Sequence, residues 1–80
     1  MTRENAIELL LDELDRAERL HPQWPLSDVD KSAIVAEEAG ELIKATLNYY
    51  YHNGGRDDMR TEAIHTGAMA LRFLINMEEV

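Results

Sequence analysis

Apolar residues recur three and four positions apart in three stretches of the chain, and two polar turns separate these stretches. In residues 2–20 acidic residues and Arg fill the positions between the apolar ones, which predicts an amphipathic helix. Thr2 is a candidate N-cap for this helix. His21-Pro22 is expected to end it, because a proline disfavours helical geometry in the residue before it.

A second helix is predicted over residues 29–52, with Ser27 or Asp28 as its N-cap. It is expected to end at the sequence NGGRDD (residues 53–58), whose Asn and Gly residues favour a turn. A third helix is predicted from about Asp58 to Met77. The chain has few Gly and Pro and no strand-like pattern, so we expect an all-α protein: a small bundle of three main helices that forms one domain, residues 1–80.

The charge balance narrows the choice of partners. Sixteen acidic residues against eight basic ones give a net charge of −8, which argues against a nucleic-acid polymer or an anionic membrane surface as partner. A small anionic ligand stays possible, because a divalent metal can invert the field of a carboxylate cluster. No stretch looks like a signal peptide or a membrane span. The chain has no Cys, which excludes thiol chemistry and is compatible with the cytoplasmic location that we expect.

Three glutamates interrupt the apolar pattern of the second helix. Glu38 projects between Ile34 and Leu42, inside the apolar arc, while Glu41 lies at its border and Glu37 just beyond. Like charges at this spacing are neighbours, and their contact is unfavourable unless a proton or a cation intervenes. A divalent cation with oxygen ligands accounts for all three acids. The alternative is an exposed acidic stripe that pairs with Lys44.

The third helix has an apolar arc that exceeds half of its circumference, beside a polar strip that contains Glu62, His65, Met69 and Arg72. An arc of this width predicts contact with more than one neighbouring helix. In so short a chain, we expect some of these neighbours to come from a second subunit.

The sequence EEAGEL, followed by EAIH, resembles the paired motif Glu-Glu-x-x-Glu and Glu-x-x-Asp of the all-α nucleoside triphosphate pyrophosphohydrolases, the MazG-like superfamily. The first half matches at Glu37, Glu38 and Glu41. The second half matches at Glu62, and His65 stands where the family has Asp. The resemblance covers roughly residues 30–77.

This resemblance implies a hydrolase that works as a homodimer or tetramer, with helices of two subunits in one bundle. It implies that the four acids (Glu37, Glu38, Glu41 and Glu62) bind Mg²⁺, which engages the triphosphate of a nucleotide. Water then attacks between the α- and β-phosphates and releases a nucleoside monophosphate and pyrophosphate. By this analogy Glu38 and Glu41 are the catalytic candidates, one of them as general base. His65 is a further candidate ligand, and an imidazole suits Mn²⁺ better than Mg²⁺.

Five further residues are candidates for substrate binding. Lys44 and Asn48 lie one turn apart on the second helix, and Arg56 follows the Gly-Gly turn; with Arg72 they are possible phosphate or sugar contacts. Trp24 offers a flat face for a nucleobase, or it caps one end of the bundle. A second function stays open: a non-catalytic helical dimer, with a degenerate metal site, that acts as an interaction or regulatory module.

Overall fold

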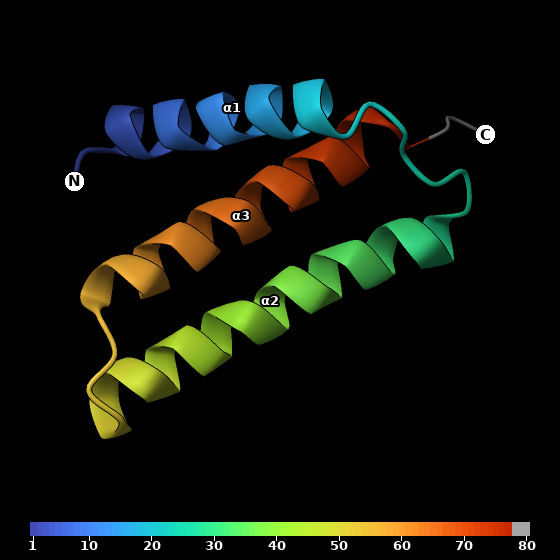
Figure 1. Cartoon of the computed structure of the whole chain (residues 1–80). Helices are drawn as coiled ribbons and strands as arrows, with labels where there is room; N and C mark the ends of the chain where they lie inside the picture. The colour runs from blue at the N-terminus through green and yellow to red at the C-terminus, as the bar shows by residue number, and fades with distance from the viewer. Residues whose placement is uncertain (78–80) are drawn as a thin grey trace.

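A computed structural model describes residues 1–77 and contains three α-helices: α1 (Arg3–Leu20), α2 (Asp28–Tyr51) and α3 (Arg56–Ile75). No strand occurs in these residues, so the prediction of a small all-α bundle is confirmed. α3 lies between the other two helices (Figure 1) and packs against both, while the backbones of α1 and α2 stay apart. The last helix in sequence is therefore the central helix of the fold.

The helix starts follow from capping side chains. The Thr2 hydroxyl accepts a hydrogen bond from the backbone N–H of Asn5 at 3.1 Å, and the Ser27 hydroxyl accepts one from Asp30 at 3.0 Å. These bonds satisfy N–H groups that have no partner within the helix. Both predicted caps are confirmed, with Ser27 rather than Asp28 at the start of α2.

The predicted bounds of α3 are wrong by two residues at each end. The helix begins at Arg56 instead of Asp58, because Gly55 takes the extended N-cap conformation. Asp57 and Asp58 then fall in the first turn, where the helix dipole favours carboxylates. At the other end the helix stops at Ile75, with Asn76 as its C-cap.

The turn between α2 and α3 depends on one residue with a left-handed backbone and on one glycine that leaves no room for a side chain. Asn53 has a φ of 61°, which Asn tolerates better than most residues. The N–H of Gly54 then donates to the Asn48 carbonyl at 2.8 Å. A Cβ at position 54 would lie 2.9 Å from the Asn48 Cβ, so only glycine fits this approach. The turn brings α3 back along α2.

The hydrophobic core is narrow. It consists of buried small and medium side chains, among which Ala68 is fully buried; the buried apolar residues are Leu14, Ala17, Ala45, Ala68 and Met69. Trp24, Ile34, Val35 and Leu71 pack against this core from the sides. The expectation that Met69 lies on a polar strip is wrong, because that side of α3 faces the space between α1 and α2 and is covered from both.

Two buried cations attach chain segments to α3. The Lys31 ammonium, 3% exposed, donates to the Asn76 carbonyl at 2.8 Å. The Arg72 guanidinium, 4% exposed, donates to the His21 carbonyl at 2.7 Å and lies 4.5 Å from the ring centroid of Trp24. Arg72 was expected on the polar strip of α3, and it is buried instead because the connection between α1 and α2 folds over it. Charge-assisted hydrogen bonds of this kind contribute about 1.5–3 kcal/mol each.

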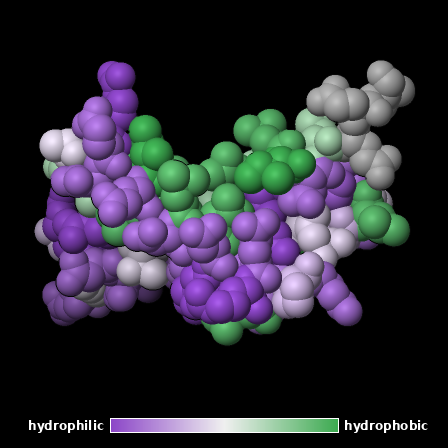
Figure 2. All heavy atoms as spheres, turned by 90° about the horizontal axis from the view of Figure 1, so that it is seen from above, coloured by the Kyte–Doolittle hydropathy of each residue, from purple (hydrophilic) through white to green (hydrophobic). Residues whose placement is uncertain are grey.

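Many large apolar side chains stay exposed. Val29, Ile43, Leu47 and Tyr50 project from α2 and are 46–77% exposed, and Leu74 on α3 is 66% exposed. Between these helices runs an open groove lined by Ser32, Val35, Ala36, Ala39, Ala70, Phe73 and Leu74. Figure 2 shows hydrophobic side chains gathered along a hollow at one edge of the molecule, with hydrophilic side chains on the flanks. Within residues 1–77, no helix is long and apolar enough to cross a membrane.

Candidate metal centre

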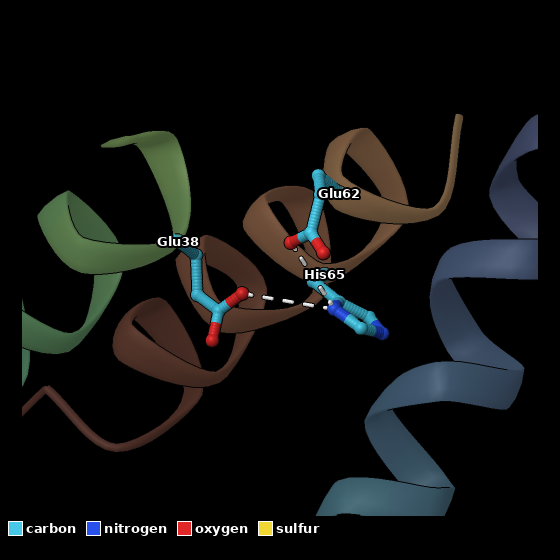
Figure 3. A group of neighbouring side chains, drawn as sticks. All are labelled: Glu38, Glu62 and His65. Carbon is cyan, nitrogen blue, oxygen red and sulfur yellow. Dashed lines mark ion pairs between the residues drawn. The ribbon is translucent and has the colours of Figure 1, made fainter. Parts of the chain in front are cut away.

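Three side chains from the two long helices meet beside the core. Glu38 comes from α2, and Glu62 and His65 come from successive turns of α3. One ligand atom from each residue lies within 4.8 Å of the other two. The His65 Nδ1 atom is 3.5 Å from a Glu62 oxygen and 3.7 Å from a Glu38 oxygen, as the dashed lines in Figure 3 mark. The pairing of α2 with α3 therefore brings Glu38, from the first half of the sequence motif, to Glu62 and His65 of the second half.

The second ring nitrogen of His65 points to α1. The His65 Nε2 atom lies 3.7 Å from an oxygen of Glu13, and in Figure 3 the ribbon of α1 passes on this side of the ring. The Arg16 guanidinium holds both Glu13 oxygens, at 3.0 and 3.3 Å. His65 is thus the one residue through which all three helices meet at this centre.

Partial burial makes the cluster electrostatically unusual. Burial of the Glu38 carboxyl raises its pKa above the ordinary value of 4.5. His65 opposes this shift, while the negative charges of Glu62, Glu37 and Glu41 add to it. The carboxylate form of Glu38 is therefore disfavoured in the metal-free protein, as expected for a like-charged group held near others away from water.

The three atoms suit a divalent metal. Ligands at neighbouring positions of an octahedral ion with bonds of about 2.1 Å are about 3 Å apart. The His65–carboxylate distances of 3.5 and 3.7 Å exceed this by well under 1 Å, and the three ligand atoms lie within 4.8 Å of one another, so side-chain rotations can bring them to bonding positions. Two carboxylates also neutralise a dication, and the imidazole nitrogen extends the range toward Mn²⁺ and other transition metals. The residues present fit the ion.

Two small pockets are lined by glutamates of the cluster. One, of about 160 Å³, shares Glu62 with the cluster and is also lined by Glu41, Lys44 and Asn48. The second, of about 170 Å³, lies toward α1 and is lined by Glu13, Arg16, Ala17, His21, Glu38, His65 and Met69. The first pocket brings three of the candidate residues from α2 to the side of the cluster.

The remaining candidate residues lie outside the three-residue group. Glu37 and Glu41 are both exposed on α2. Trp24 packs against the core, with the Arg72 guanidinium over its ring. Arg56 is the first residue of α3, and its guanidinium lies 5.7 Å from the ring centroid of Tyr49. Their suggested roles in metal or substrate binding stay predictions.

Sequence reasoning missed Glu13. It lies among several acids of α1, and nothing in its spacing relates it to residues 50 positions away. The available signal was weak: its side chain is 15% exposed, and it is one of the few acids that fall beside the apolar positions of its helix. Only the packing of α1 on α3 reveals its position against His65.

Comparison with family models, curated proteins and solved structures finds no match for this chain.

The raised pKa of Glu38 predicts how stability depends on pH. Between the ordinary value of 4.5 and the raised value, the folded protein binds a proton that the unfolded chain releases, so stability falls as pH rises through this window. Above this pH window, the loss of stability caused by the Glu38 charge reaches its full size. In the absence of metal, we expect Glu38→Gln to raise the free energy of unfolding at neutral pH. This gain in stability should vanish below pH 4.5.

Urea unfolding over a series of pH values in a chelator measures this difference. Glu18→Gln is the matched control, because Glu18 is exposed on α1, and it should change stability little at any pH. A Glu38→Gln protein that is less stable than the parent at neutral pH would contradict the assignment.

Proposed function

We propose that this protein is a small metal-dependent nucleoside triphosphate pyrophosphohydrolase of the MazG-like type. The observation that carries the proposal is the convergence of Glu38, Glu62 and the Nδ1 atom of His65 on one point between α2 and α3. The proposed reaction hydrolyses the bond between the α- and β-phosphates and gives a nucleoside monophosphate and pyrophosphate.

The proposal assigns the ligand positions to Glu38, Glu62 and His65. Glu37 and Glu41 lie on α2 within one turn of Glu38 and raise its pKa, so both are close enough to act on the same ion through water or after a side-chain movement. A bound Mg²⁺ or Mn²⁺ supplies neutralisation of phosphate charge and a water molecule with a lowered pKa. We assign the general-base role to Glu41, which is exposed and lines the flanking pocket.

The flanking pocket supports an anionic substrate. Lys44 brings a mobile cation and Asn48 an amide to the side of Glu62, and both groups can donate to phosphate oxygens. One lysine does not neutralise a triphosphate, so most of the compensation must come from the metal. Substrate affinity is therefore expected to depend steeply on the presence of the ion.

The second candidate function is an interaction module with a degenerate metal site. The large apolar surface on α2 and α3 favours it, because exposed patches of this kind mark contacts with other proteins. The two functions differ in what the carboxylates do, and a substrate assay with a binding control separates them.

The parent protein, incubated with a panel of nucleoside triphosphates and either Mg²⁺ or Mn²⁺, should release a monophosphate and pyrophosphate. Glu62→Gln removes one proposed ligand and should lower the rate by at least about 100-fold, which corresponds to about 2.7 kcal/mol of transition-state stabilisation. Its thermal shift with Mn²⁺ should also disappear, since a ligand stabilises only the state that binds it.

Glu18→Gln on the exposed side of α1 serves as the control and should keep both the activity and the shift. A parent that is stabilised by metal but hydrolyses none of the nucleotides would favour the interaction module. A parent with no metal-dependent shift would rule out the metal centre itself.

The assembly that we propose is a homodimer, because the single chain leaves too much surface uncovered. Its accessible surface is 6046 Å², about 1,100 Å² more than the roughly 4,900 Å² expected for a folded monomer of 9.2 kDa. Its radius of gyration is 13.7 Å, against about 11.6 Å for a compact chain of this length. A standard protein interface covers about 800 Å² on each partner. A second copy of the chain therefore accounts for the excess.

The proposed contact surface is the outer apolar face of α2. Val29, Ala36, Ile43 and Tyr50 are spaced by seven residues, so they form one stripe along the helix. Near its middle, the small residue Gly40 has no atom within 4 Å of the position that a Cβ would take. The open groove beside the stripe adds Phe73 and Leu74 of α3. Packing two such faces together buries apolar surface that the monomer exposes to water.

Ile43→Glu tests this surface. A carboxylate in the middle of the stripe should convert the dimer to a monomer in sedimentation experiments, because it would have to be buried without a partner. Leu20→Glu, at a similarly exposed apolar position on α1, should leave the dimer intact. A monomeric parent, or an Ile43→Glu protein that still dimerises, would contradict the proposed interface.

A further inference from the structure

Glu13 is the one acid of α1 that reaches the metal centre, and the proposed ligand set does not use it. It lies 3.7 Å from the Nε2 atom of His65, on the side of the ring opposite to Glu38 and Glu62. Its position excludes it from the group of three ligand atoms, which contains Nδ1. The acid therefore faces the imidazole and not the ion position.

We propose that Glu13 is a positioning residue that fixes His65 with the proton on Nε2 and the free electron pair on Nδ1. A neutral imidazole has one nitrogen that donates and one that accepts or binds a metal. If the proton stays on Nε2, where Glu13 accepts it, Nδ1 is the atom left to bind the ion between Glu38 and Glu62. The proposal rests on the proposed metal centre and adds α1 to it.

Glu13 is itself held in place. Arg16, one turn further along α1, binds both of its oxygens at 3.0 and 3.3 Å, and its side chain is 15% exposed. This contact keeps a carboxylate oxygen directed at His65. The distance of 3.7 Å to Nε2 is about 0.7 Å longer than an N–H···O hydrogen bond, so a small rotation of the Glu13 side chain toward the ring closes it.

Glu13, His65 and the proposed ion position have the arrangement of a carboxylate–histidine–metal triad. A carboxylate behind a ligating histidine orients the ring and makes its free nitrogen more basic, and loss of such a partner typically weakens metal binding by about 10- to 100-fold. The Glu13 carboxylate also adds a negative charge next to His65, whose neutral imidazole has no charge. Glu13 of α1 thus orients the imidazole of His65. An imidazole ligand needs such a partner, whereas a carboxylate ligand at this position would not.

The test uses the full chain loaded with Zn²⁺, which is diamagnetic and suits nitrogen NMR. In the parent, the ¹⁵N shifts should identify Nδ1 of His65 as metal-bound, and the Nε2 proton should give a signal protected from exchange with water. Glu13→Leu should lose this protected signal and bind Mn²⁺ about 10- to 100-fold more weakly in calorimetry. Glu13→Gln keeps one acceptor oxygen and should restore part of the affinity.

Glu18→Gln changes an exposed acid on the same helix and should behave as the parent in both measurements. A thermal melt of each metal-free variant separates a loss of fold from a loss of positioning. The inference is overturned if Nε2 binds the metal, or if Glu13→Leu keeps the protected proton and the parent affinity. Unchanged behaviour of Glu13→Leu leaves the metal centre standing, whereas metal on Nε2, or a parent that binds neither Zn²⁺ nor Mn²⁺, removes both.

Discussion

The structure depends on the central position of α3. Because α3 alone packs against both other helices, every helix–helix contact among the described residues involves its surface. One side of α3 carries Ala68, which is fully buried in the core. The neighbouring side carries Glu62, His65 and Arg72, which meet polar groups of α2, α1 and the loop between them. The packing that forms the core therefore also forms the polar cluster beside it.

The cluster lowers the stability of the metal-free protein, and this loss of stability points to a role other than folding. Glu38 is held where its charged form is disfavoured, although the same position on the helix would suit a leucine between Ile34 and Leu42. A side chain that stabilised only the fold would be apolar here. A divalent cation reverses the balance, because the same closely spaced carboxylates then attract it. The cluster thus lowers the stability of the metal-free protein and raises its affinity for a divalent cation.

The sequence predicts local structure better than it predicts burial. The caps at Thr2 and Ser27 and the anomaly of Glu38 follow from residues close together in the chain, so periodicity and capping chemistry locate them. Arg72 and Lys31 were not predicted to be buried, because their burial depends on which segments fold over them. Glu13 was missed for the same reason, since its contact with His65 spans more than 50 residues. Ile43 and other large apolar side chains of α2 are exposed, and only the fold shows that the chain itself leaves them uncovered.

The most direct test of the central claim is anomalous diffraction from crystals of the protein grown with Mn²⁺. The account predicts one strong anomalous peak between the carboxylates of Glu38 and Glu62 and the Nδ1 atom of His65, with Glu13 against Nε2 on the far side of the ring. Absence of a peak at this position at a saturating Mn²⁺ concentration, or peaks confined to exposed acids elsewhere on the surface, would contradict it.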